Sequence, residues 1–420
     1  MQDQEERTIA ALEPTDAEPE PLNDEPPPPP NAERRLVSMD AYRGFVMLLM
    51  ASEGLGIPEV AKRFPSSRAW QLLNYQFSHV QWIGCGLWDM IQPSFSFLVG
   101  VALPYSYAAR KSRGQSYGRM FAHALGRSLT LILLGIFLRS MHSTQTNFTF
   151  EDTLTQIGLG YPFLFLLARY PARVQAMVCG FILVGYWMLF ATYPLPAAGF
   201  DFAGVGVPAD WPHLQGFAAH WDKNTNFAAA FDQWFLNVLP RPKLFVFNGG
   251  GYLTLSFLPT LGTMILGLLA GGMLRSGPQP AATKFRILVV AGIAMLAVGW
   301  AIGSVGLCPV VKRIWTPSWT IFSGGWCCLF MAAFYGIIEI KQKVKWSFPL
   351  VVVGMNSIAM YLIAHIFYKL IRESYRIHLG QNIWEHIGGI YAPILEASAI
   401  LFGMWLITYW MYRRKLFLRI

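Results

Sequence analysis

The feature that most constrains this chain is a series of apolar windows, each about 20 residues long, running from residue 38 to residue 412. One helix of that length crosses the hydrocarbon layer of a bilayer, which is about 30 Å thick. Ten such windows are predicted, at 38–57, 84–108, 119–140, 153–169, 172–194, 252–274, 285–306, 318–340, 348–370 and 391–412. The sequence therefore predicts an all-α, polytopic membrane helix bundle with about ten transmembrane helices.

The composition agrees with a membrane protein. Of the 420 residues, 54% are hydrophobic and only 14% are charged, which is too apolar for an ordinary soluble protein of this size. The net charge of +9 would suggest nucleic acid as a partner of a soluble protein. Here the basic excess lies in short loops beside apolar windows, as membrane topology predicts, so nucleic acid is not expected.

The loop charges also predict the orientation. Ten crossings place both termini on one side, and the short segments on that side carry 18 Lys and Arg residues. The longer loops opposite carry about 12. Because basic residues gather on the cytoplasmic side, both termini are predicted to be cytoplasmic. The loops at 58–83, 195–251 and 371–390 then face outward.

Two segments stand apart from the windows. Residues 1–33 hold ten of the 24 acidic residues and a run of five prolines, and are predicted to be a disordered, acidic, Pro-rich cytoplasmic tail. Residues 34–420 then form one transmembrane domain. Its only sizeable extracytoplasmic loop, 195–251, combines Trp with Asp, and we interpret it as an interfacial loop anchored by Trp. A sugar-facing surface is the alternative interpretation.

Charged residues inside a membrane cost several kcal/mol unless they are paired or face water, so each one is a functional candidate. Asp40 and Arg43 are three residues apart at the start of the first window. This spacing puts them on one helical face, where they can form an ion pair or jointly bind a polar ligand. An interfacial salt bridge that fixes the first helix explains the pattern equally well.

The richest polar cluster surrounds the second window. His79 lies just before it, and Asp89 and Pro93 lie within it. Pro93 lacks an N–H, so the helix is predicted to kink there and free the carbonyl of residue 89. A neutral imidazole can attack a thioester or take a proton, and a carboxylate can orient it. A histidine in a loop is, however, more often a structural residue.

The ninth window carries a polar stripe. Ser357, Tyr361 and His365 recur at i, i+4 and i+8, which places them on one helical face. Asn356 lies nearly opposite His365 on an ideal helix, so both can reach one site only if the helix is broken, as Gly354 would permit. The alternative is that the stripe joins two helices by hydrogen bonds.

Together these clusters resemble heparan-α-glucosaminide N-acetyltransferase and its bacterial relatives, from about Arg34 to the C-terminus. The matching pieces occur in the same order: Asp40-x-x-Arg43-Gly44, His79 followed by Trp82, Asp89 and Pro93 with Phe95 and Phe97 beyond, Gly354-Met355-Asn356-Ser357 with His365, and the ending Tyr412-Arg413-Arg414-Lys415-Leu416-Phe417.

The resemblance implies a multi-pass acetyltransferase that moves an acetyl group from cytosolic acetyl-CoA to the amine of a glucosamine across the membrane. It assigns the active histidine to His79 and a supporting shell to Asp40, Arg43, Asn356 and His365, which we expect to bind the donor, together with Asp89. That Asp89 orients His79 is our own inference, because ten residues separate them and only a fold-back would join them. No metal site is expected.

The chain departs from the family on the acceptor side. Ser52 and Glu53 stand where the lysosomal member has an asparagine, and Asn248 to Gly251 replace an acidic element. A large lumenal N-terminal domain is absent, which suggests a protein of the bacterial plasma membrane.

The expected partners are membrane lipids, a glycan or amino-sugar acceptor and, as one alternative, a second copy of the chain in a homodimer. The alternative functions are a transporter or flippase of a sugar or lipid-linked substrate, and a non-catalytic scaffold. The intramembrane polar residues would serve a carrier as a binding site, although no internal repeat typical of carriers is seen.

Overall fold

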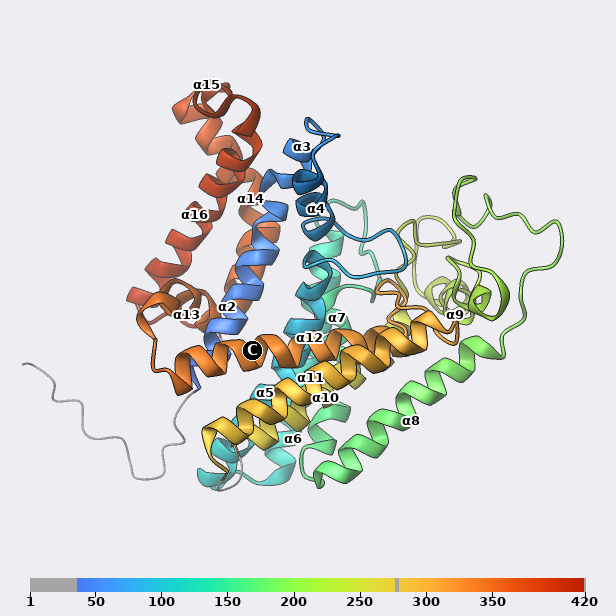
Figure 1. Cartoon of the computed structure of the whole chain (residues 1–420), viewed down its shortest axis with the longest axis horizontal. Coiled ribbons are helices and arrows are strands. Elements are labelled where there is room, and N and C mark those ends of the chain that lie inside the picture. Colours follow the sequence, from blue (N-terminus) through green and yellow to red (C-terminus); the bar gives the residue numbers. More distant parts are fainter. Residues whose placement is uncertain (1–35, 276–278, 419–420) are drawn as a thin grey trace, which may run out of the picture. The chain divides into compact units, whose positions relative to one another are not determined.

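The computed structural model describes residues 36–275 and 279–418, where the regular structure is helical. The elements are α2 Val37–Ala51, η1 Glu53–Gly56, α3 Ile57–Ala61, α4 Arg68–Gln76, η2 Trp88–Met90, α5 Ile91–Ser112, α6 Tyr117–Ser140, α7 Thr153–Leu167, α8 Ala172–Ala191, η3 Gly216–Trp221, α9 Phe227–Phe235, η4 Leu236–Val238, η5 Thr254–Ser256, α10 Phe257–Arg275, α11 Ala281–Ser304, α12 Pro317–Tyr335, η6 Gly336–Ile340, η7 Lys345–Ser347, α13 Phe348–Met355, α14 Ser357–Leu379, α15 Ile383–Gly388, η8 Gly389–Tyr391 and α16 Ala392–Arg413. The all-α class is confirmed within these ranges. The tail predicted over residues 1–33 lies outside the described residues. Figure 1 shows the arrangement of the described elements.

Every predicted window coincides with helical structure, yet fewer helices have the length and hydropathy of a membrane span. Six helical stretches qualify in the described part of the chain: α6, α8, η5 with α10, α11, α12 with η6, and α15 through α16. Two bent pairs, α2 with η1–α3 and η7–α13 with α14, raise the number to eight if each is one span. The chain is a multi-pass membrane protein, with six to eight candidate spans where about ten were predicted.

The second and fourth windows explain the lower count. α7 has only 15 residues, which is short for a crossing. α5 begins at Ile91, so Asp89 lies before it, in the short turn η2. Pro93 then occupies the first turn of α5, where the missing N–H removes no helical hydrogen bond. The predicted kink at Pro93 and the placement of Asp89 within the long helix are therefore wrong.

Two helices are interrupted. After α2 the chain bends by 52° into η1 and α3, through four successive residues of positive φ, Glu53 to Gly56. Asn356 separates α13 from α14, and the two helices meet at a bend of 70°. The helix is thus broken in the ninth window, two residues beyond Gly354, which is the condition stated for Asn356 and His365 to share a site.

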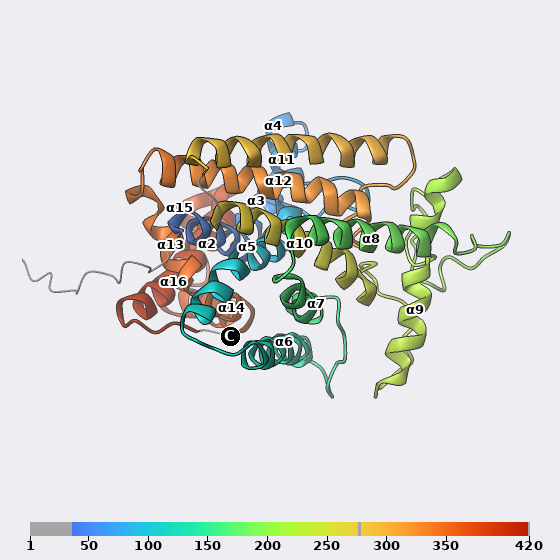
Figure 2. The same ribbon diagram turned by 90° about the horizontal axis from the view of Figure 1, so that it is seen from below.

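The helices pack in layers. Figure 2 shows α11 and α12 in one layer, α8 and α10 in the next, and α6 with α7 on the far side. Close crossings depend on glycine: a Cβ on Gly267 of α10 would overlap the carbonyl of Phe97 in α5, and one on Gly100 would overlap that of Met264. Such close backbone approach at small residues is typical of helices packed in membranes.

The 195–251 loop has a small core of its own. Trp211 and Trp221 are buried, and the indole of Trp82 donates to the Trp221 carbonyl at 3.1 Å. Trp82 also packs edge-on against Trp211, with ring centroids 5.4 Å apart. These tryptophans therefore hold the 195–251 loop against the segment that carries His79. Because their rings are covered, they do not form an open sugar-stacking surface.

Candidate functional site

His79 and Asp89 are in direct contact. The loop after α4 folds back before η2, so that Nδ1 of His79 lies 2.9 Å from Oδ1 of Asp89. The buried carboxylate also accepts the backbone N–H groups of Val80 and Gly86 through Oδ2, at 3.2 and 3.1 Å. The predicted fold-back is thus observed, and Asp89 fixes both the imidazole and the loop that carries it.

Lys312 completes this cluster. An antiparallel bridge joins Ile83 to Val311 and brings the α11–α12 loop beside His79. Nζ of Lys312 lies 3.2 Å from Oδ1 of Asp89 and 3.0 Å from Nδ1 of His79. No local signal predicted this role, because in the sequence Lys312 is one more basic residue of a predicted outer loop. Only the long-range bridge places it here.

The cluster favours a neutral imidazole. Burial lowers the pKa of His79, and the Lys312 ammonium lowers it further, while the hydrogen bond to Asp89 acts in the opposite direction. We place the proton on Nδ1, because the carboxylate of Asp89 only accepts hydrogen bonds. The Lys312 ammonium only donates, so in this tautomer it donates to Oδ1 of Asp89 and not to Nδ1. Nε2 then carries the lone pair, and it has no hydrogen-bond partner among the described residues. This nitrogen can act as a nucleophile or a base.

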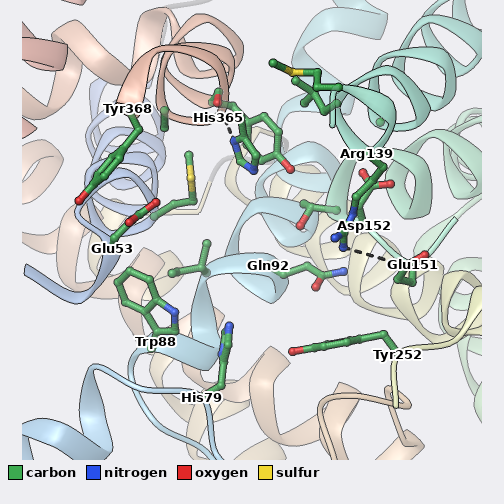
Figure 3. A pocket seen from close by; sticks show the side chains of 18 of the residues that line it. Glu53, His79, Trp88, Gln92, Arg139, Glu151, Asp152, Tyr252, His365 and Tyr368 are labelled. Carbon is green, nitrogen blue, oxygen red and sulfur yellow. Dashed lines mark hydrogen bonds and ion pairs between the residues drawn. The ribbon is translucent and has the colours of Figure 1, made fainter. Parts of the chain in front are cut away.

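His79 and Lys312 line a cavity of about 770 Å³. In Figure 3, His79 and Tyr252 lie at one end, His365 and Tyr368 at the other, and Gln92 between them. A cavity of this volume accommodates a ligand of several dozen non-hydrogen atoms. The His79 side chain is 41% exposed even though its loop is fixed, because it faces this space.

His365 faces the same cavity from α14. Its Nδ1 lies 2.8 Å from the carbonyl of Tyr361, and its ring stacks on that of Tyr361 with centroids 4.2 Å apart. The carbonyl can only accept, so Nδ1 is protonated and Nε2 is the acceptor when the ring is neutral. The polar stripe of the ninth window is therefore a cavity wall at Tyr361 and His365, one of its two predicted interpretations.

Acidic and basic groups on the α6–α7 side were not recognised from the sequence. Arg139 pairs with the nearly buried Glu151 at 3.5 Å, and both line the cavity. Asp152 caps α7 by accepting the N–H of Leu154 at 2.9 Å, so its role is structural. An Asp before Thr at the start of an apolar run was a readable cap signal. The cavity position of Glu151 was not.

The other predicted site residues lie elsewhere. Asp40 and Arg43 form the predicted i, i+3 ion pair at 3.3 Å, and the Arg43 guanidinium also reaches the Gly354 carbonyl at 3.5 Å. Asn356 is buried, donates to the Leu416 carbonyl at 2.9 Å and accepts the N–H of Leu418 at 3.1 Å. None of these three residues is among those that line the cavity.

The fold and site define a class: a multi-pass helical membrane protein in which an oriented histidine lines a large polar cavity. Comparison with known proteins adds a family. The chain is 22% identical over 424 aligned residues to "Heparan-alpha-glucosaminide N-acetyltransferase" of Homo sapiens, and 21% identical over 428 residues to the protein of that name in Mus musculus. It is a distant relative of this acetyltransferase family, which confirms the resemblance seen in the sequence.

The alignment covers most of this chain but only part of each relative. It covers 92% of this chain but only 60% of each relative, so the chain spans about three fifths of their length. No family model matches the chain.

Proposed function

We propose that this chain is a membrane-bound N-acetyltransferase that moves an acetyl group from acetyl-CoA to a glucosamine-like amino sugar, or another glycan acceptor, on the extracytoplasmic side. The observation that carries the proposal is the His79 imidazole, fixed by Asp89 and Lys312 with its Nε2 free to react at the wall of a large cavity. The names of both relatives support acyl transfer to an amino sugar.

In one mechanism His79 carries the acetyl group. Nε2 attacks the thioester carbonyl carbon, the C–S bond breaks, and CoA leaves as a thiolate. The acetylated ring is then a cation, which the adjacent Asp89 carboxylate stabilises. The acceptor amine attacks the acetyl carbon, the C–Nε2 bond breaks, and the proton lost by the amine passes through solvent to the thiolate. The products are the amide, the CoA thiol and a neutral imidazole.

In the other mechanism His79 is a general base in a ternary complex. Nε2 takes a proton from the amine as the amine nitrogen attacks the thioester carbonyl, and the C–S bond then breaks. The proton passes from Nε2 to the leaving sulfur. Lys312 also lines the cavity, so its ammonium can stabilise negative charge that develops on the carbonyl oxygen in either mechanism.

The supporting residues divide into two groups under this proposal. His365 lines the cavity and can contact the donor or the acceptor directly. Asp40, Arg43 and Asn356 act through position, because they join α2, the break between α13 and α14, and the C-terminal segment. We place the enzyme in a bacterial plasma membrane with both termini in the cytoplasm, so that the donor enters from inside.

The test uses purified protein in detergent with labelled acetyl-CoA and a panel of amino sugars. We expect acetylated sugar from the wild type, and a loss of about 10²- to 10⁴-fold in His79→Ala, the usual contribution of a general base. His378→Ala, which changes an exposed histidine near the end of α14, is the matched control. A burst of CoA and a trapped acetyl adduct at residue 79 would select the carrier mechanism.

A wild type that neither hydrolyses acetyl-CoA nor acetylates any acceptor without compartments would refute the enzyme and favour the carrier alternative. Equal turnover by His79→Ala and the wild type would refute the assigned site.

A further inference from the structure

A second cavity, of about 390 Å³, adjoins the first and has no part in the chemistry proposed above. Glu53 and Tyr368 line both cavities, and Figure 3 shows them on the same edge of the first. Further lining residues come from α3, α14, α15 and the start of α16, among them Glu59, Arg63, Arg372, Trp384, Glu385 and Glu396. The two spaces therefore meet at the Glu53–Tyr368 pair.

The backbone at this junction is strained. Glu53 has φ 45° and Leu55 has φ 52°, in the left-handed region that side chains other than glycine rarely adopt. Gly56, with φ 62°, lies so close to α16 that a Cβ would overlap the backbone of Pro393. Such strain persists only where the surroundings enforce it, and it gathers at functional sites. Here it holds the exposed Glu53 carboxylate at the boundary that the two cavities share.

Carboxylates outnumber guanidinium groups in the second cavity, where Arg63 donates to the Ile390 carbonyl and has no carboxylate partner among the described residues. Arg372 and Arg376 both bind Glu396, with their Nε atoms 3.1 and 2.8 Å from its Oε1. Glu59 and Glu385 have no hydrogen-bond partner among the described residues. In total the wall carries four carboxylates (Glu53, Glu59, Glu385, Glu396) and three guanidinium groups (Arg63, Arg372, Arg376). An anionic ligand would face more carboxylates than guanidinium groups, whereas hydroxyls and amines can donate to the carboxylates.

Trp384 adds an unmet donor. Its indole N–H is buried with no acceptor among the described residues, and its ring packs edge-on against Tyr375 at 5.9 Å. A buried donor without a partner costs about 1–3 kcal/mol. Trp384 lines the cavity, and a hydroxyl placed there has lone pairs to accept hydrogen bonds and a proton to donate to a carboxylate. An aromatic ring beside hydroxyl-binding carboxylates is a combination that suits a sugar.

We infer that the second cavity binds the next sugar unit of an uncharged or amine-bearing oligosaccharide whose terminal unit is acetylated in the first cavity. The inference rests on the proposed function for the identity of the reaction. It adds the substrate class: the acceptor is an oligosaccharide, and its second unit carries hydroxyls or an amine and no carboxylate or sulfate. In the topology predicted from the loop charges, residues 58–83 and 371–390 face outward, on the same side as His79.

The test compares three acceptors: glucosamine, its β-linked disaccharide, and glucosamine linked to a uronic acid. We expect the wild type to prefer the disaccharide to glucosamine by about tenfold in kcat/KM, equivalent to about 1.4 kcal/mol. The difference should lie in KM, because binding remote from the reacting amine is retained in the transition state. The uronic-acid acceptor should be no better than glucosamine.

Variants assign the effect to the second cavity. Trp384→Ala should lose the disaccharide preference and retain the rate with glucosamine, and Trp384→Phe should restore part of the preference. Glu385→Gln should improve the uronic-acid acceptor relative to the disaccharide. Trp300→Ala, which removes an exposed tryptophan of α11, is the control for loss of an aromatic residue.

Equal kcat/KM for glucosamine and the disaccharide in the wild type would overturn the inference. It would also be overturned if Trp384→Ala lowered kcat/KM equally for both acceptors and Trp384→Phe restored none of the preference for the disaccharide. If the wild type acetylates nothing, the proposed function fails, and calorimetry with the fully N-acetylated disaccharide decides the cavity separately. Binding that is lost in Trp384→Ala supports the sugar site, and no binding to the wild type refutes it.

Discussion

Lys312 and Asp89 should set the ionisation of His79 in opposite directions. Replacing Lys312 by Met removes an ammonium whose Nζ lies 3.0 Å from Nδ1. The charge of a protonated imidazole is spread over its ring, so the effective separation is about 4 Å, where unit charges interact by about 1 kcal/mol in water and about 4 kcal/mol at an effective dielectric constant of 20. Because the His79 side chain is 41% exposed, the lower part of that range applies.

An interaction of about 1–2 kcal/mol corresponds to roughly one pKa unit. Burial and Lys312 hold the pKa of His79 below its usual value, so removing the ammonium should raise it. The acidic limb of the pH profile should then move upward by about one unit in Lys312→Met. In Asp89→Asn the favourable carboxylate is lost, so the limb should move to lower pH and activity should also fall.

The assay is kcat/KM for acetyl-CoA as a function of pH at saturating acceptor. Ionisation of the acceptor is the same in every variant, so differences between profiles isolate the enzyme. Lys369→Met is the matched control, because Lys369 lines the same cavity without contacting His79. Limbs that coincide in all four proteins, or that move the same way in Lys312→Met and Asp89→Asn, would refute the electrostatic account.

Three further predictions concern stability. Gly267→Leu should prevent correct packing of α10 on α5, whereas Gly180→Leu, where a Cβ meets no atom within 4 Å, should be tolerated; thermal unfolding in detergent compares them. Burial raises the pKa of Asp232 to about 7, so its protonated form stabilises the fold and that contribution is lost as the pH rises toward and through 7. In the wild type this loss should lower the melting temperature between pH 5 and pH 8, by a free energy of unfolding of at most about 1.4 kcal/mol per pH unit. Asp232→Asn should make this decline shallower, and an unchanged slope would contradict the prediction. Asn356→Ala should cost about 1–3 kcal/mol by removing two hydrogen bonds to the C-terminal backbone, and it should make the C-terminal segment easier for a protease to cleave. Equal cleavage of variant and wild type would exclude the tether.

Much of the fold could be predicted because the signal is local. Each apolar window of about 20 residues contains helical structure. The break in the ninth window was considered only as a condition for Asn356 and His365 to share a site, and the structure has the break without the shared site. The count of spans was less predictable. α7 is short for a crossing, whereas the 22-residue α5 is long enough but too polar to qualify as a span.

The site was predictable only in part, for the same physical reason. His79 and Asp89 are ten residues apart, and their pairing was proposed because a carboxylate can orient an imidazole. Lys312 and Glu53 have no such local partner. The isolated bridge places Lys312 beside His79, and a strained turn places Glu53 at the cavity. Contacts between distant segments leave no periodic trace in the sequence. Asp40 and Arg43 show the converse, since their spacing correctly predicted their pairing but not their distance from the cavity lining.

The bridge between Ile83 and Val311 has a consequence for biogenesis. Lys312 follows His79 by 233 residues. A nascent chain inserted only as far as α5 therefore contains His79 and Asp89 without the Lys312 ammonium. The bridge must close before the cluster has its observed geometry. A growing chain cannot present the finished site to cellular thioesters until the α11–α12 hairpin has left the ribosome and docked.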